Sequence, residues 1–355
     1  MKRFHAAGAL GAYACLHAGL AFAQNPSPID IRACSAIETD AQRLLCYDKA
    51  TGRDKLPQAA KKKDEKGESI SVDLATRNSQ DVARPVSLLD SRWELSPDSK
   101  LGTFNLRGYK PTYALPFFGT TKQNKTPSSP APNHTVTVPQ ELQNVEAKFQ
   151  ISLKTKVWEN VFGDNGDLWV GYTQSSRWQV YNKENSRPFR ETNYEPEALL
   201  VFNTNYNLFG WSGRLADIGV NHQSNGRADP LSRSWNRVVA DFGFERENWV
   251  VNLRPWWRIP EGGKEDDNPN IQDYMGRGEI QIVHEMGANE FALTARHSFR
   301  TGDRSHGSLR GTWSFPVVHN LRGYLEVFDG YGESLIDYNH RATYLGVGVS
   351  LLDWY

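Results

Sequence analysis

The chain has 355 residues, and its 41 Lys and Arg residues balance its 41 Asp and Glu residues, so the formal net charge at pH 7 is zero. A neutral chain lacks the basic surface typical of a nucleic-acid-binding protein. The mean hydropathy of −0.61 and the lack of an apolar run of about 18 residues exclude a helical membrane protein. The 11 Trp, 14 Tyr, 16 Phe and 29 Gly residues suit a β-barrel with aromatic girdles and a polar interior, although secreted all-β proteins share this composition.

Residues 1–23 have the features of a secretory signal peptide. Lys2 and Arg3 give a short basic start, residues 6–20 are mostly small and apolar, and Ala21-Phe22-Ala23 forms an A-x-A cleavage site. An N-terminal core helix is the alternative, which the basic start and the small residues at the end disfavour. We therefore expect an exported chain.

The exported chain retains two cysteines, Cys34 and Cys46. An even pair in an exported chain predicts a disulfide, with two free thiols as the alternative. Ile37, Leu44 and Leu45 fit a short amphipathic helix between the cysteines. We expect residues 24–50 to form a small disulfide-linked helical module on the periplasmic side.

Residues 51–86 are predicted to form a flexible linker. They contain the charge run 61–66 and little apolar material, a composition typical of solvated, disordered chain. The remaining residues, 87–355, are expected to form one domain. Within it, residues 120–139 are rich in Pro, Ser, Thr and Asn and predict a long loop.

The rest of the chain alternates with period two. In residues 145–154 the odd positions are apolar and the even positions polar, which predicts a strand with one apolar and one polar face. Similar runs recur at residues 249–254, 321–327 and 344–355. Several runs reach about ten residues, the span of a tilted membrane strand, so a twelve-stranded antiparallel transmembrane β-barrel is favoured over a soluble sandwich. The expected strands begin near residues 102, 145, 167, 192, 211, 231, 247, 272, 288, 305, 319 and 340.

Two polar residues interrupt the apolar face of one of these strands. Residues 216, 218 and 220 are apolar, and His222 and Ser224 continue the same parity, although polar groups facing hydrocarbon are costly. In the next strand Asn236 shares the parity of the apolar residues 238, 240, 242 and 244. A hairpin apex near residues 229–230 places His222 opposite Asn236, with Cβ atoms about 4.5–5.5 Å apart.

Ser224, His222 and Asn236 match the roles of nucleophile, general base and orienting group. A serine hydroxyl is a weak nucleophile at neutral pH and needs a base, and histidine titrates near neutrality. An asparagine fixes the ring tautomer without burying a second charge. No Lys shares this face nearby, so backbone amides after Ser224 or a bound cation must stabilise the oxyanion. The alternative is that all three residues lie in the polar headgroup zone and have no catalytic role.

Several stretches of the sequence resemble the outer-membrane phospholipase A family. The resemblance runs from about residue 100 to the C-terminus and leaves out residues 24 to about 85. Its active-site signature is matched at residues 221–227, 229–230 and 232–237, and further similar stretches lie at 172–174, 188–196, 266–269 and 330–339. One departure is Gln223, where the family commonly has an acidic residue. Gln223 has the parity of the residues that face the lumen, so we expect this departure to have little effect on His222 and Ser224.

The resemblance implies a calcium-dependent outer-membrane enzyme that hydrolyses phospholipid acyl esters, of A1 and A2 type, at the outer leaflet. Ser224 would be the nucleophile, His222 the base and Asn236 the orienting residue. The family is active as a homodimer that shares Ca²⁺ between subunits. The matching calcium ligands are the Arg227 carbonyl and the Ser232 hydroxyl of one subunit, Ser186 of the other, and, in the monomer, Asp267.

Further consequences of the resemblance concern the dimer and the metal. Gln174 matches a polar position of the dimer interface, and its parity places it on the lipid face. Three of the four calcium ligands are neutral oxygen donors, so waters must complete the shell and the affinity should be modest. The ion would polarise the ester carbonyl.

Two other functions stay open at this point. The first is a passive outer-membrane pore or structural barrel, since charged lumenal side chains can line a channel, although small barrels fill their interiors with such side chains. The second is an adhesin or periplasmic tether that uses residues 24–60. Calcium-dependent ester hydrolysis in detergent distinguishes the lipase from both.

Overall fold

The computed structural model describes residues 34–37, 39–51, 87–263 and 266–355. The chain divides into two compact units, Met1–Ser69 and Ile70–Tyr355. The expected signal peptide, residues 1–23, lies outside the described residues, as does nearly all of the expected linker. Within the described residues, no helix is both long enough and apolar enough to cross a membrane.

In the first unit, Cys34 and Cys46 are joined by a disulfide, with their Cα atoms 5.5 Å apart. Helix α2 spans Asp40–Thr51, so it begins after Ile37 and continues past Cys46. The first half of this helix, which includes Leu44 and Leu45, lies between the cysteines as expected, but the helix excludes Ile37 and extends beyond Cys46. Arg43 donates to the Ile37 carbonyl at 3.1 Å, which ties the segment before the helix to its first turn.

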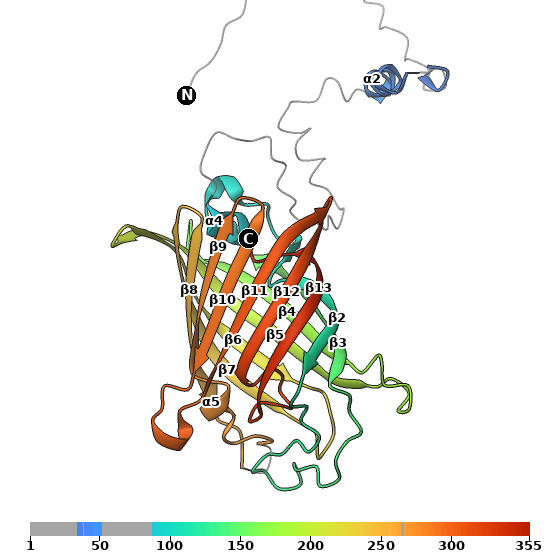
Figure 1. Cartoon of the computed structure of the whole chain (residues 1–355). Coiled ribbons are helices and arrows are strands. Elements are labelled where there is room, and N and C mark those ends of the chain that lie inside the picture. The colour runs from blue at the N-terminus through green and yellow to red at the C-terminus, as the bar shows by residue number, and fades with distance from the viewer. Residues whose placement is uncertain (1–33, 38, 52–86, 264–265) are drawn as a thin grey trace, which may run out of the picture. The chain divides into compact units, whose positions relative to one another are not determined.

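The second unit is a closed antiparallel barrel of twelve strands, which confirms the predicted fold (Figure 1). Each strand pairs with its neighbours in the chain, and β13 pairs with β2 to close the cylinder. A short additional strand, β1 (Leu106–Gly108), pairs with β3 alone. The twelve barrel strands are β2 (Thr112–Thr120), β3 (Val145–Trp158), β4 (Asp167–Trp178), β5 (Phe189–Leu208), β6 (Trp211–Ser224), β7 (Ser234–Arg246), β8 (Trp249–Ile259), β9 (Gly278–Met286), β10 (Asn289–His297), β11 (Gly307–Val318), β12 (Leu321–Tyr331) and β13 (Arg341–Leu352).

Two of the expected strand starts are wrong, and the other ten lie within three residues of the observed ones. The first barrel strand begins at Thr112 rather than near residue 102, because the chain first forms β1 outside the closed sheet. The eighth barrel strand, β9, begins at Gly278 rather than near residue 272. Helix α5 (Ile271–Tyr274) occupies that position, and Gly276, at φ 95°, turns the chain before the strand can start.

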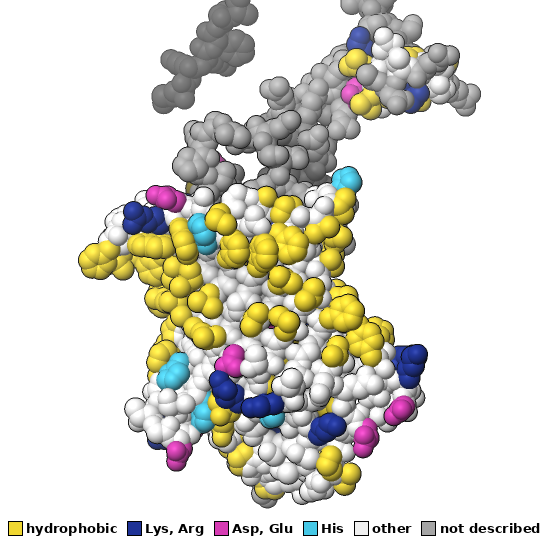
Figure 2. All heavy atoms as spheres, in the orientation of Figure 1, with side chains coloured by type: hydrophobic (Ala, Val, Ile, Leu, Met, Phe, Trp, Pro, Cys, Tyr) yellow, Lys and Arg dark blue, Asp and Glu magenta, His cyan; other side chains and the backbone are white. Residues whose placement is uncertain are grey.

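Alternation along each strand separates an apolar outer face from a polar interior. In β6, Ile218 and Val220 are 51% and 53% exposed, whereas Asp217 before them and Asn221 after them are buried. Figure 2 shows hydrophobic side chains gathered over the strands, with charged side chains mainly at and beyond the strand ends. This distribution is the one that a wall in contact with lipid requires.

The two ends of the barrel differ. At one end the chain reverses in two-residue turns, such as residues 209–210 and 247–248, and helix α4 (Leu88–Trp93) lies near the C-terminus (Figure 1). Arg92 of α4 donates to the Trp354 carbonyl at 2.7 Å. The hydrophobic side chains of this helix, Leu88, Leu89 and Trp93, are buried. At the other end long loops join the strands, including residues 121–144, the loop predicted from composition. Outer-membrane barrels place short turns in the periplasm and long loops outside.

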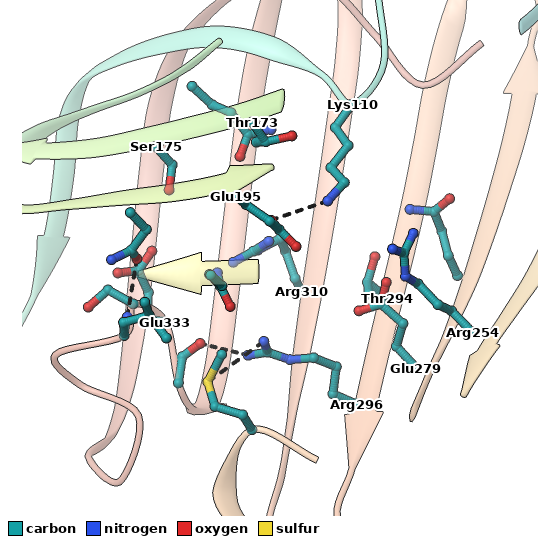
Figure 3. A pocket seen from close by; sticks show the side chains of 18 of the residues that line it. Lys110, Thr173, Ser175, Glu195, Arg254, Glu279, Thr294, Arg296, Arg310 and Glu333 are labelled. Atoms are coloured by element: carbon teal, nitrogen blue, oxygen red, sulfur yellow. Dashed lines mark hydrogen bonds and ion pairs between the residues drawn. The ribbon is translucent and has the colours of Figure 1, made fainter. Parts of the chain in front are cut away.

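Paired charges fill much of the barrel interior. Lys148 Nζ lies 2.6 Å from Glu326 and 2.9 Å from Glu333, and Arg177 lies 2.7 Å from Glu333. A cavity of about 150 Å³ remains among such side chains, and Figure 3 shows charged groups from several strands converging on it. This volume admits only a small number of waters, so the lumen is a packed polar core rather than a wide channel.

A packed lumen predicts that the protein conducts ions poorly. We expect no stepwise conductance when the purified barrel is reconstituted into a planar bilayer, because ion-paired side chains obstruct the path. Folding is checked by the shift in gel migration of the unheated barrel. Stable unitary conductance steps from folded protein would contradict this expectation.

Candidate active site

The β6–β7 hairpin brings His222 and Asn236 together. The two residues are directly opposed in the antiparallel register, which is the pairing expected from the position of the turn. His222 Nδ1 and Asn236 Oδ1 are 2.7 Å apart. The amide oxygen can only accept, so Nδ1 carries the proton and Nε2 is left as the basic nitrogen.

This pair lies on the outer wall of the barrel. His222 is exposed and Asn236 is half-buried, whereas Trp235, the residue before Asn236, is fully buried. Trp235 Nε1 donates to Gln223 Oε1 at 2.9 Å inside the barrel. Gln223, the departure from the family pattern, therefore faces away from His222.

Ser224 is the last residue of β6 and lies on the same face as His222. It pairs with Ser234 of β7 and with Tyr194 of β5. Residues two apart on a strand are separated by roughly 7 Å between Cα atoms, a distance that Ser and His side chains can bridge. Within the described residues the Ser224 hydroxyl has no hydrogen-bond partner, so it is free to rotate toward the ring.

The backbone after Ser224 offers one unused donor. The Asn225 N–H donates to the Arg233 carbonyl at 3.0 Å, but the Gly226 N–H has no partner among the described residues. Gly226 adopts φ 59°, and a Cβ there would meet the Tyr194 ring at 3.2 Å. Glycine is therefore favoured where this amide is presented beside Ser224.

Two of the four expected calcium ligands are in contact. Ser232 Oγ donates to Asp267 Oδ2 at 2.6 Å, although the residues are 35 apart in the chain. The other Asp267 oxygen lies 3.0 Å from His134 Nε2, and the same nitrogen lies 3.1 Å from Asp229. His134 thus bridges two carboxylates at the edge of the site.

The other two expected ligands lie apart from this contact. Arg227 precedes Ser232 in the β6–β7 loop, and its guanidinium donates to the Phe189 carbonyl at 3.4 Å. Ser186 is exposed in the β4–β5 loop at φ 58°, and no contact joins it to Ser232 or Asp267 within the described part of the chain. In that same part, no group of three or more His, Cys, Asp or Glu side chains could hold a metal ion.

Four residues near the site were not predicted from the sequence to be functional. His134 and Asp229 contact Asp267 or its neighbours, as described above. Asn236 Nδ2 donates to Glu261 Oε1 at 2.8 Å, and Arg258 approaches the other Glu261 oxygen at 3.4 Å. The four residues that sequence reasoning did not assign to the site are therefore His134, Asp229, Arg258 and Glu261. Asp229 lay within the matched signature, but the other three come from loops or strand ends with no local signal.

The environment of Glu261 shifts its ionisation. Burial raises the pKa of its carboxyl group; Arg258 opposes this rise and Asp266 reinforces it, while the hydrogen bond from Asn236 favours the charged form. Glu261 follows β8, outside the membrane-spanning strands.

Gln174 lies at the same height on the barrel wall as Ser224. Gln174 of β4 pairs with Tyr194 of β5, and Tyr194 pairs with Ser224 of β6. Two inter-strand steps span about 10 Å. Tyr172 Oη donates to Gln174 Oε1 at 3.2 Å, so the amide is part of a polar patch on the outer face.

Comparisons with known proteins agree on one family. The family model described as Phospholipase A1 matches residues 89–351. Phospholipase A1 of Escherichia coli K12 is 44% identical over 208 residues, covering 59% of this chain and 70% of that protein. A protein of Neisseria meningitidis serogroup B, described as a putative phospholipase A1, is 33% identical over 350 residues and covers 90% of each chain.

Solved structures give the same result. The outer membrane phospholipase dimer of Salmonella typhi with bound calcium is 38% identical, with a TM-score of 0.64, over 71% of this chain and 94% of that chain. Outer membrane phospholipase A of Escherichia coli is 37% identical, with a TM-score of 0.63, over 71% and 100%. With the family match over most of its length, this chain belongs to the phospholipase A1 family and is a phospholipase, a carboxylic ester hydrolase.

Proposed function

We propose that this protein is a calcium-dependent phospholipase of the outer membrane that cleaves acyl ester bonds, of A1 and A2 type, with Ser224, His222 and Asn236, and that it is active as a homodimer. The observation that carries the proposal is the 2.7 Å contact between His222 Nδ1 and Asn236 Oδ1 on the outer wall, two residues from an unpaired serine hydroxyl. A polar cluster of this kind is unexpected on a face that otherwise carries Ile218 and Val220.

The chemistry follows from the positions of the donors and acceptors. The Ser224 hydroxyl attacks the ester carbonyl carbon while His222 Nε2 takes its proton, and His222 later returns a proton to the leaving alcohol. Asn236 accepts from Nδ1–H and keeps the ring in the tautomer that this transfer needs. The Gly226 N–H, which has no partner among the described residues, would donate to the oxyanion. Water then cleaves the acyl-enzyme ester.

An active-site asparagine has support from a relative. A structure of the Escherichia coli enzyme, 35% identical with a TM-score of 0.64, is described as an active-site mutant in which an asparagine is replaced by alanine. Asn236 is the asparagine that contacts the base in this chain.

The position of the site on the outer wall of the barrel would give membrane lipid direct access to Ser224. The site lies where β6 ends at the long-loop end of the barrel, the end that faces outward in outer-membrane barrels. A phospholipid of the outer leaflet can thus reach Ser224 sideways, with its acyl chains along the apolar wall. In this orientation the short turns and α4 are on the periplasmic side. We propose a periplasmic location for the N-terminal segment as well.

The residues beside the triad fit a calcium ion. Hydroxyl and carboxylate oxygens of Ser232 and Asp267 lie 2.6 Å apart, and oxygen donors of this type suit a hard cation. Arg227 and, from a second subunit, Ser186 would contribute further oxygens. Bound there, Ca²⁺ would polarise the ester carbonyl. The Salmonella typhi relative was solved with calcium, which supports this assignment.

A homodimer explains why one barrel holds only part of the ligand set. Among the described residues, no contact joins Ser186 to Ser232 of the same subunit, so a second barrel would have to supply Ser186. Gln174 lies about two strands from Ser224 at the same height, so a partner docked on this patch would adjoin the active site. The Salmonella typhi relative is a dimer.

Replacing Ser224 tests the nucleophile. We expect Ser224→Ala to lower kcat by about 10³-fold or more, because Ser234, the serine opposite Ser224 on this face, donates to Asp267 Oδ2 at 3.5 Å instead. Ester hydrolysis is measured in detergent with calcium, and gel migration of the unheated sample reports the folded barrel. Ser212→Ala, an exposed serine at the other end of β6, serves as the control and should keep the parent rate. Full activity in Ser224→Ala would disprove the assignment.

Metal dependence tests the calcium ligands. Chelation should abolish turnover, and Ca²⁺ should restore it better than Mg²⁺, which requires a smaller octahedral shell. Ser232→Ala is expected to raise the Ca²⁺ concentration for half-maximal activity by at least about 10-fold, since one ligand oxygen is lost. Thr301→Ala, exposed in another loop of the same end, is the control. Chelator-resistant turnover would argue against a catalytic metal.

Mixing inactive and active subunits tests the dimer. Ser224→Ala retains Ser186, so adding it to dilute parent protein should raise the turnover per parent subunit, because each mixed dimer contains one complete site. The double variant Ser224→Ala/Gln174→Ala should stimulate less, since its docking patch is altered. Turnover per subunit that is independent of total protein concentration and of added Ser224→Ala would exclude activation by dimerisation.

A further inference from the structure

The side chain of Asn236 has two hydrogen-bond partners on opposite sides. Its Oδ1 is 2.7 Å from His222 Nδ1, and its Nδ2 donates to Glu261 Oε1 at 2.8 Å. The oxygen and the nitrogen of a carboxamide are nearly equal in size, so shape alone does not decide which of them faces the histidine. The hydrogen-bond partners, His222 and Glu261, decide which atom of the amide faces the histidine.

We propose that Glu261 is a positioning residue that fixes the amide orientation of Asn236, and through it the tautomer of His222; this inference rests on the proposed function. A carboxylate can only accept hydrogen bonds, so Glu261 binds the NH₂ group and leaves Oδ1 for His222. If the amide were reversed, its NH₂ group would face Nδ1. Nδ1 would then have to accept, and the proton would move to Nε2, where it blocks the general base.

An asparagine needs such a residue, whereas an aspartate in its place would not. Both oxygens of a carboxylate accept from a histidine N–H, so a Ser-His-Asp arrangement works in either orientation. In this chain the neutral amide avoids a second charge at the lipid-facing wall, but it has one correct and one incorrect orientation. Glu261 removes the incorrect one.

The register of the barrel explains how Glu261 reaches Asn236. Asn236 of β7 is opposed on its other side by Ile259, the last residue of β8. Glu261 is two residues further along and has the same parity, so its side chain returns to the outer face next to Asn236. The contact therefore follows from the β7–β8 pairing, not from proximity in the sequence.

A buried arginine holds the Glu261 loop in place. Arg258 points inward from β8 with a side chain only 7% exposed, and its Nη2 lies 3.4 Å from Glu261 Oε2 and 2.6 Å from Asp266 Oδ1. Its Nη1 donates to the Pro269 carbonyl at 3.0 Å. The Asp266 N–H donates in turn to the Gly262 carbonyl at 3.1 Å. This anchoring limits the movement of the carboxylate relative to Asn236.

The first test compares two replacements of Glu261. Glu261→Ala frees the amide, so kcat should fall by about 10-fold with KM unchanged, since small misplacements of catalytic groups cost up to about 100-fold. Glu261→Gln keeps an acceptor oxygen at the same position and should recover kcat to within about threefold of the parent. Asp303→Ala, an exposed acidic residue of another loop at the same end, should have no effect. A kcat for Glu261→Ala equal to that of the parent, or a Glu261→Gln as slow as Glu261→Ala, would overturn the proposal.

The second test asks whether Glu261 acts through Asn236. In an Asn236→Ala background, Glu261→Ala should change kcat by less than about twofold, because the group that it orients is already missing. An equal loss in both backgrounds would show a role independent of Asn236 and would overturn the proposal. All rates are expressed per folded barrel, measured by gel migration.

The variants distinguish a failure of the proposed function from a failure of the positioning role of Glu261. If Ser224→Ala is inactive but Glu261→Ala matches the parent, the proposed function stands and the positioning role is wrong. If Ser224→Ala remains active, the triad itself is wrong and the role of Glu261 falls with it.

Discussion

The antiparallel register of β6 and β7 is the constraint on which the site depends. Opposed residues in such a pair project from the same face, so the pairing of His222 with Asn236 places an imidazole and an amide in contact without a dedicated loop or pocket. A shift of β6 by one residue would turn His222 into the lumen and leave Asn236 on the outer wall without its partner. The register is held along the whole hairpin, because the same shift would also put Ile218 and Val220 inside and Asp217 in lipid. The energy that keeps the apolar face of the barrel in contact with lipid therefore also keeps His222 and Asn236 aligned.

Interior and exterior of the barrel use polar groups in different ways. Inside, carboxylates and cations neutralise each other, as Lys148 does with Glu326 and Glu333, and little free volume remains. Outside, charge is scarce, and the orienting residue beside the histidine is a neutral amide. The carboxylate that accepts from this amide belongs to Glu261, which follows the end of β8, and Arg258 approaches its other oxygen. Charge is thus kept within reach of the chemistry but away from the hydrocarbon.

The proposed metal site shows how assembly can control such an enzyme. Ser232 and Asp267 are in contact within one barrel, whereas Ser186 lies in a separate loop, and nothing in the described part of the chain joins it to either residue. A barrel alone would offer a weak oxygen site, and a second barrel docked beside Gln174 would complete it. Control by dimerisation would then require no movement of the triad, since His222 and Asn236 are already paired in the single chain.

The sequence by itself determined the period-two pattern, the number of barrel strands, ten of the twelve strand starts to within three residues, and the pairing of His222 with Asn236. These features are local: alternation is visible residue by residue, and a hairpin register follows from its turn. The tertiary structure alone decided the contacts between distant segments, such as Ser232 with Asp267, His134 with Asp229, and Glu261 with Asn236. Loop residues at the barrel end carry no periodicity, and their neighbours depend on how the closed sheet brings separate loops together.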